Sequence, residues 1–286
     1  MIKQKTIKHS VSIRGVGLHS GKPVEVTFHP APCDYGIVFR RVDMPQPNEI
    51  PAKFDQVSTT DLATKLTFGN SSVATVEHLL SAFVGLSLDN VLVELTSEEV
   101  PILDGSSLLF IQLLQAAGIE EQSKAKNFIK ITKTCKVGTE DSWASLEPFD
   151  GFCVKFTIEF NHPVFKNGPQ WIEFHVNTIA YAKEISSART FGFMSDLEKL
   201  RAKNLAQGGG LANAVVLDDS KVINKEGLRF DDEMVRHKVL DAIGDLFLIG
   251  GTLVGKFSGY KSGHKLTNEL LRKIHTENAW ETVTLS

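Results

Sequence analysis

Arg236-His-Lys-Val-Leu-Asp-Ala-Ile-Gly-Asp245 places one histidine and two aspartates at intervals of four residues, namely His237, Asp241 and Asp245. Residues four apart lie on one face of an α-helix. The surrounding residues are largely apolar, and carboxylates are rarely buried unless they are paired or bind a metal. The spacing therefore predicts a helix with a metal-binding face, although a solvated stripe on an amphipathic helix has the same spacing.

The segments on either side of this helix predict an α+β chain in two similar halves. In each half, alternating strand-like segments are followed by a helix, a strand and a second helix. A polar segment of poor periodicity, 120–127, separates the halves. We expect an N-terminal α+β domain at 1–122 and a C-terminal α+β domain at 128–286, each a β-sheet packed with two helices.

The main helix is expected to begin after Asp231 as its N-cap and to end at Gly250-Gly251. Residues 193–219 interrupt the second half with a polar helical piece, a Gly208-Gly-Gly210 hinge and an apolar strand. A long segment of this kind between regular elements is typical of an insertion or lid.

The composition is that of an ordinary globular protein: 286 residues, 42% hydrophobic, 23% charged and a net charge of -3. This charge does not favour nucleic acid as a partner. The three cysteines are widely spaced and suit a reducing compartment. The start lacks the apolar core of a signal peptide, and no apolar run is long enough for a transmembrane segment. We therefore expect a cytoplasmic protein.

A second ionisable pair, Glu77-His78, lies in the apolar segment 75–83. His78 would complete a His₂Asp ligand set with His237 and Asp241, and three protein ligands with one open position are typical of catalytic zinc. Glu77 would then lie beside the metal as a general base. The alternative is a surface histidine on a helix, and the HExxH motif of common metalloproteases is absent.

In Ser262-Gly-His264, a glycine precedes a histidine that lies at the expected start of a helix. Asp245 could hold His264 protonated by a hydrogen bond, and Lys238 could add positive charge to the same site. The alternative for His264 is an ordinary loop or N-cap residue. The loop 15–21 weakly resembles a phosphate-binding loop, but its glycine spacing is not that of a known motif.

Seven segments in the same order give the chain a resemblance to the UDP-3-O-acyl-N-acetylglucosamine deacetylase family, the zinc amidases of lipid A biosynthesis. The resemblance covers essentially the whole chain. The segments are Gly15-Val-Gly-Leu-His-Ser-Gly21, Thr75-Val-Glu-His-Leu-Leu-Ser81, Pro101-Ile-Leu-Asp-Gly-Ser106, Ala188-Arg-Thr-Phe191, Asn213-Ala-Val-Val216, Arg236–Asp245 and Ser262-Gly-His264.

The resemblance implies a role for each matching residue. It implies one catalytic Zn²⁺, or Fe²⁺ in its place, held by His78, His237 and Asp241. It implies that the catalytic residues are the base Glu77, the charged His264 with its partner Asp245, the carbonyl-binding Thr190, and Lys238.

The resemblance also implies an insert in each domain, the second of which forms an apolar passage for the acyl chain. The expected substrate-binding residues are Phe191 and His19, with Met194, Leu197, Leu211, Ala214 and Val216 lining the passage. Relatives often have Gly-Leu-Ala-x-Gly-Gly-Ser where this chain has Asn204-Leu-Ala-Gln-Gly-Gly-Gly210. The preferred acyl length therefore does not follow from the resemblance.

The expected activity is metal-dependent hydrolysis of the N-acetyl group of UDP-3-O-acyl-N-acetylglucosamine, which gives acetate and the free amine. The expected protein is a cytoplasmic monomer of a Gram-negative-type bacterium, with a UDP-linked acylated amino sugar as its small-molecule partner. Two rival hypotheses are a metal-dependent amidase for another N-acyl sugar and a non-catalytic binding module with a structural metal.

Overall fold

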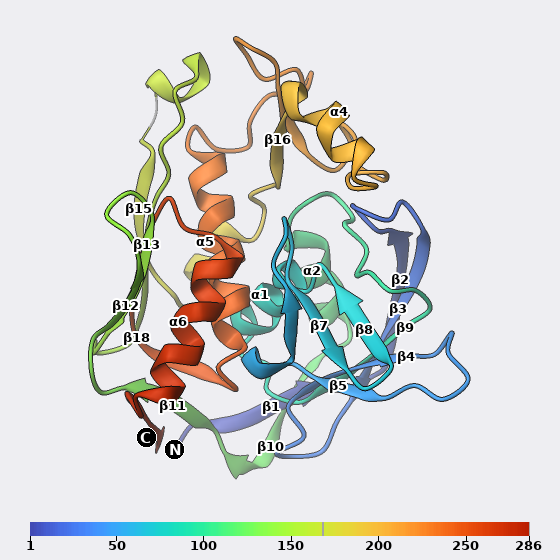
Figure 1. Cartoon of the computed structure of the whole chain (residues 1–286). Helices are drawn as coiled ribbons and strands as arrows, with labels where there is room; N and C mark the ends of the chain where they lie inside the picture. The colour runs from blue at the N-terminus through green and yellow to red at the C-terminus, as the bar shows by residue number, and fades with distance from the viewer. Residues whose placement is uncertain (168, 286) are drawn as a thin grey trace.

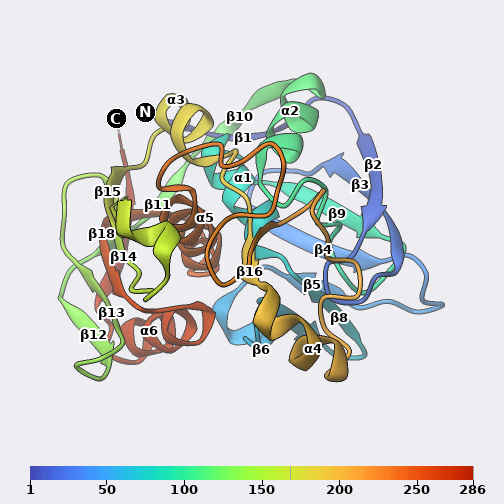
Figure 2. The ribbon, with the colours of Figure 1, turned by 90° about the horizontal axis from the view of Figure 1, so that it is seen from above.

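The computed structural model describes residues 1–167 and 169–285, which form a mixed α/β fold. A sheet of each half lies on the outside, and helices lie between the two sheets (Figures 1 and 2). The predicted α+β class, with two helices packed on each sheet, is confirmed. No helix among the described residues is long and apolar enough to cross a membrane.

The first half contains a five-stranded sheet in the order β2-β3-β9-β4-β5. Its strand β3 alternates between buried and partly exposed residues, so one face of the sheet packs on helices and the other meets solvent. A smaller sheet, β6-β7-β8, lies beside it as the insert of this half. The bounds are β1 Lys3–Ile7, β2 Val11–Val16, β3 Pro23–Pro30, β4 Ile37–Arg41, β5 Glu49–Pro51, β6 Val57–Thr59, β7 Lys65–Phe68, β8 Ser71–Ala74, α1 Glu77–Gly85, β9 Val91–Leu95 and α2 Leu108–Ala116.

The second half contains a seven-stranded sheet around the long strand β18, with α5 and α6 packed on it. The bounds are β10 Ile119–Ala125, β11 Asn127–Ile131, β12 Cys135–Gly138, β13 Trp143–Glu147, β14 Phe152–Thr157, β15 Trp171–His175, α3 Thr178–Ala180, β16 Phe191–Phe193, α4 Met194–Ala202, β17 Val215–Leu217, α5 Glu233–Phe247, β18 Thr252–Tyr260, α6 His264–Thr276 and β19 Trp280–Thr284.

Helices α1 and α5 cross at the centre of the molecule, and their contact depends on a glycine. A Cβ added to Gly244 of α5 would lie 2.0 Å from the carbonyl oxygen of Glu77 at the start of α1. Only glycine permits this backbone approach. Because Glu77 and Gly244 touch, the ionisable residues of α1 face those of α5.

Several boundaries differ from the sequence-based predictions. The segment 120–127, expected as a linker, mostly forms β10, which pairs antiparallel with β1. Helix α5 begins one residue later than expected: Asp232 is its N-cap, and the Asp232 carboxylate binds Arg236 instead of capping the backbone. Between β15 and β16, the short helix α3 continues directly as a π-helix at Tyr181–Ile185.

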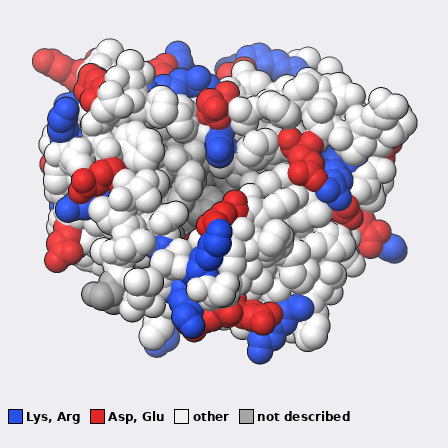
Figure 3. All heavy atoms as spheres, turned by 90° about the horizontal axis from the view of Figure 1, so that it is seen from below, with Lys and Arg blue, Asp and Glu red and all other residues white. Residues whose placement is uncertain are grey.

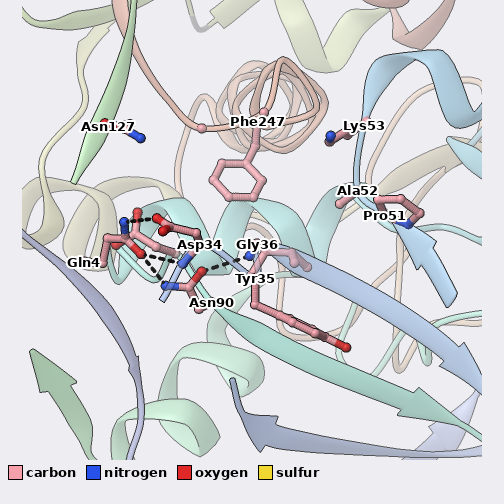
Figure 4. Close-up of a pocket in the computed structure, with 14 residues that line it drawn as sticks. Gln4, Asp34, Tyr35, Gly36, Pro51, Ala52, Lys53, Asn90, Asn127 and Phe247 are labelled. Atoms are coloured by element: carbon pink, nitrogen blue, oxygen red, sulfur yellow. Dashed lines mark hydrogen bonds between the residues drawn. The ribbon is translucent and has the colours of Figure 1, made fainter. Parts of the chain in front are cut away.

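A cavity of about 230 Å³ lies at the carboxyl end of α5 (Figure 4). The Phe247 ring points into it, and Gln4, Asp34 and Asn90 form its polar wall. Gln4 Nε2 donates to Asp34 Oδ1 at 2.7 Å, and Asn90 Nδ2 donates to Gln4 Oε1 at 2.9 Å. These groups bind one another, so we interpret this wall as structural.

The face seen from below in Figure 3 carries basic and acidic side chains side by side, with no large area of one sign. Such a mixed surface does not resemble the basic footprint of a nucleic-acid-binding protein. It agrees with the small net charge of the chain.

Candidate metal centre and active site

Three ligand-type side chains meet where α1 crosses α5. His78 Nε2 and His237 Nε2 lie 3.4 and 3.3 Å from the same atom, Asp241 Oδ1. Ligand atoms of the three residues all lie within 4.8 Å of one another, and all three residues are buried. The structure therefore brings together the three predicted metal ligands from two distant parts of the sequence.

The hydrogen bonds of this cluster fit a cation at its centre. His237 Nδ1 lies 3.0 Å from the carbonyl oxygen of Ala188, which requires Nδ1 to carry the proton and leaves a lone pair on Nε2. Burial lowers the pKa of His237 to about 3, so the ring is neutral near pH 7. Asp241 Oδ1 is buried and has no hydrogen-bond partner among the described residues. A divalent ion would satisfy this oxygen and both imidazoles.

The second oxygen of Asp241 is held by Lys238, whose Nζ donates to Oδ2 at 2.7 Å. Burial favours the neutral amine, but Asp241 outweighs it and raises the pKa of Lys238. The ammonium is therefore charged, and it orients the carboxylate so that Oδ1 faces the two histidines. Lys238 also lines the pocket described below.

Glu77 lies next to His78, His237 and Asp241 but is not one of these three candidate ligands. Its side chain is buried, and Oε2 accepts a hydrogen bond of 3.0 Å from the backbone N–H of Thr64. Burial raises the pKa of Glu77, and the neighbouring His264 and His78 act in the opposite direction. A carboxylate with a raised pKa beside a metal site is suited to accepting a proton.

His264 begins α6 and faces both Glu77 and Asp245. Its Nδ1 lies 2.6 Å from Asp245 Oδ2, and its Nε2 lies 4.0 Å from Glu77 Oε1. Burial opposes protonation of His264, but Asp245 and Glu77 outweigh burial and raise its pKa to about 9. The imidazole is thus a cation near neutral pH.

One residue that organises this site could not be identified from any sequence motif. Thr64 donates its backbone N–H to Glu77 and its hydroxyl to Asp245 Oδ1 at 2.6 Å. It lies in the loop between β6 and β7, 181 positions away from Asp245. Its neighbours Asp61-Leu-Ala63 form no motif, so only the folded chain connects Thr64 to the site.

A pocket of about 420 Å³ opens onto the metal cluster. Glu77, His78, His237, Lys238, Asp241, Thr190, Phe191 and His264 all line it. Asp245 lies behind His264, away from the lining. Two contacts hold the segment Ala188–Phe191 against α5. Arg189 donates buried hydrogen bonds to Glu233, and the carbonyl oxygen of Ala188 contacts His237.

An apolar pocket of about 330 Å³ adjoins the first, and Thr190 and Phe191 line both. The polar helix and the apolar strand expected at 193–219 are present as α4 and β17. The apolar pocket is lined by every residue that we expected to bind substrate, namely His19, Phe191, Met194, Leu197, Leu211, Ala214 and Val216.

Comparisons with known proteins identify the family of the chain. The chain matches the family described as LpxC, UDP-3-O-acyl N-acetylglycosamine deacetylase, over residues 4–276. Proteins named UDP-3-O-acyl-N-acetylglucosamine deacetylase from Thioalkalivibrio sulfidiphilus and Nitrosococcus oceani are 53% and 54% identical to it over 285 residues. A third, from Xanthomonas axonopodis pv. citri, is 54% identical over 286 residues, and each alignment covers 99% of this chain and 94% of the relative. The chain therefore belongs to the UDP-3-O-acyl-N-acetylglucosamine deacetylase family.

Proposed function

We propose that this chain hydrolyses the acetamide of UDP-3-O-acyl-N-acetylglucosamine and releases acetate and the free amine. Its family performs this deacetylation in lipid A biosynthesis. The observation that best supports the proposal is the unpartnered Asp241 Oδ1 between two imidazoles, with Glu77 beside them.

His78, His237 and Asp241 would hold one divalent ion, and the mixed nitrogen and oxygen donors suit Zn²⁺, with Fe²⁺ as the alternative. When bound, such an ion supplies Lewis acidity and lowers the pKa of water to about 7 in well-studied sites. The protein's own part is to keep the ligands in place through Ala188 and Lys238.

Glu77 acts as the general base in this proposal. Its carboxylate takes a proton from the attacking water, whose oxygen then forms a bond to the acetamide carbon. The backbone N–H of Thr64 fixes one oxygen of Glu77 and leaves the other, Oε1, facing His264. This hydrogen bond orients the Glu77 carboxylate toward the pocket, where the substrate would lie, and away from bulk water.

His264 supplies the positive charge, which Asp245 maintains. As a cation it either donates a proton to the leaving amine when the carbon–nitrogen bond breaks or stabilises the oxyanion. Thr190 lines the pocket and would donate its hydroxyl to the same oxyanion. Lys238 adds a further positive charge near the reacting group.

The adjoining apolar pocket would hold the 3-O-acyl chain. Its lining is mostly aliphatic and aromatic, which suits an alkyl chain. We further propose that the protein acts as a monomer in the cytoplasm, where its three free cysteines remain reduced.

Acetate release tests the proposal. We would measure it with UDP-3-O-acyl-N-acetylglucosamine, with the same sugar without its acyl group, and with other N-acetylated sugars. We expect the highest kcat/KM for the first. A higher value for another N-acyl sugar would show an amidase of different specificity, and a protein that binds metal but releases no acetate would be a binding module.

A further inference from the structure

Two glycine-rich segments, one from each half of the chain, touch through their backbones. Gly208 N donates to the carbonyl oxygen of Leu18 at 3.0 Å, and Gln207 N donates to that of His19 at 3.2 Å. A Cβ added to Gly208 would lie 2.2 Å from the carbonyl oxygen of Gly17. This glycine contact, between 17–19 and 207–208, therefore requires glycine at position 208. The first residue of the hinge expected at 208–210 is thus in contact with the loop of the first half.

Glu99 lies directly behind the first of these segments, and it is only 2% exposed. Its Oε1 accepts hydrogen bonds from His19 N at 2.8 Å and from the Thr75 hydroxyl at 2.9 Å, and its Oε2 accepts one from Ser20 N at 2.8 Å. A Cβ added to Gly17 would lie 2.2 Å from Oε2. The buried carboxylate thus fixes the backbone that receives the glycine contact.

The glycine contact joins two walls of the apolar pocket. Leu18 and His19 line the pocket from the first half, and Ala206 and Gly209 line it from the insert of the second half. If the contact opened, these walls would separate and water would reach the pocket. Apolar binding would weaken, because it depends on the area removed from water.

We propose that Glu99 and the glycine contact are a specificity-determining device that keeps the insert closed over the acyl chain. The inference rests on the proposed function, because it assumes an acylated substrate. Glu99 acts as a positioning residue: it touches no reacting atom and acts through the loop 17–20. Closing the pocket lets binding of the remote acyl chain help to place the acetamide at the metal cluster.

The test compares substrates with a long and a short saturated 3-O-acyl chain. In Gly208→Ala we expect the long-to-short ratio of kcat/KM to fall by about 10- to 200-fold, the discrimination that one methylene provides in an apolar pocket. Gln207→Ala is the matched control, since it removes an exposed side chain from the same segment and keeps the backbone N–H. It should keep the parent ratio.

Glu99→Gln is the second variant, in case Gly208→Ala folds poorly. Both carboxylate oxygens accept from a backbone N–H, so the amide NH₂ faces a donor in either orientation. We expect the same loss of discrimination with unchanged metal content. Amide hydrogen exchange in 206–209 should accelerate in both variants but not in Gln207→Ala.

An unchanged long-to-short ratio in Gly208→Ala and Glu99→Gln, with faster exchange in 206–209, would overturn the proposal. Binding of a saturated fatty acid, measured by calorimetry, tests closure without the reaction. We expect about tenfold weaker binding in both variants, and equal binding would also overturn the proposal. A parent that releases no acetate from either substrate would instead refute the proposed function, and fatty-acid binding would still decide whether the contact closes the pocket.

Discussion

Asp245 serves two partners with its two oxygens, and neither partner is a metal ligand. Oδ2 contacts His264 Nδ1, and Oδ1 accepts from the Thr64 hydroxyl. The side chain is buried, so a missing partner would not be replaced easily by water. Asp245 therefore links the charged imidazole of His264 to Thr64.

Asp245→Asn should change the pH dependence of kcat/KM. In the proposed mechanism His264 acts in its protonated form, so activity should fall as the pH rises through its pKa of about 9. Without the Asp245 charge this pKa drops, and the alkaline limb should move to lower pH. The acidic limb, which reports the raised pKa of Glu77, should change little. If the alkaline limb of Asp245→Asn stays at the parent pH, the Asp245 charge does not control the pKa of His264. If His264→Gln still shows an alkaline limb, a group other than His264 causes it.

Thr64→Val should lower the stability of the protein, because it removes the hydroxyl and leaves a buried oxygen of Asp245 without its donor. The expected loss is about 1–3 kcal/mol in the free energy of unfolding. Thr64→Ser keeps the hydroxyl and should lose much less. Denaturant unfolding of both variants makes the comparison, and a Thr64→Val protein as stable as the parent would show that the hydroxyl does not stabilise the fold.

At the scale of the elements, the contact between α1 and α5 creates the site. His78 and Glu77 come from α1, whereas His237 and Asp241 come from α5. Gly244 allows the two helices to approach until backbone and Cα meet. The distance between the ligands is thus determined by a residue that is not itself a ligand.

Gly244→Ala should reduce stability and turnover together. The added methyl would overlap the carbonyl of Glu77, and overpacking in a core typically costs about 1–3 kcal/mol. The same displacement moves Glu77, so kcat should fall. Gly251→Ala is the control, because the nearest atoms to its Cβ would be 3.6 Å away. Parent-like kcat in Gly244→Ala would show that the helix spacing does not control the base.

The sequence predicted the elements that carry the site better than the elements at the edges of the sheets. The spacing of His237, Asp241 and Asp245 follows from helix geometry alone, so their common face could be predicted. Strands β10 and β19 could not, because polar segments such as 119–125 form strands only when a partner strand is present. The role of Thr64 depends on tertiary contacts and has no local signal.

In the molecule as a whole, the proposed metal site lies where the two halves of the chain meet. We propose that residues 1–122 and 128–286 are two domains, with the helices of each forming their common interface. One ligand comes from the first part and two come from the second. A bound ion would therefore connect them in addition to the glycine contact.

Zinc should raise the melting temperature of the protein. A ligand that binds only the folded state at 100 times its Kd adds about 2.7 kcal/mol of stability. We expect removal of metal with a chelator to lower Tm and Zn²⁺ to restore it. In His78→Ala, which removes the one ligand that we propose from residues 1–122, Zn²⁺ should have little effect. An equal rise in parent and variant would place the stabilising ion elsewhere.

We propose that His78, His237 and Asp241 hold the metal and that Glu77 acts beside it without binding it. The most direct test is the metal-to-protein ratio in the parent, His237→Ala and Glu77→Ala, with acetate release measured on the same samples. We predict about one ion per chain in the parent and in Glu77→Ala, and a large loss in His237→Ala. Activity should fall in both variants, by about 10²–10⁴-fold in Glu77→Ala. Stoichiometric metal in His237→Ala, or loss of metal in Glu77→Ala, would contradict this assignment.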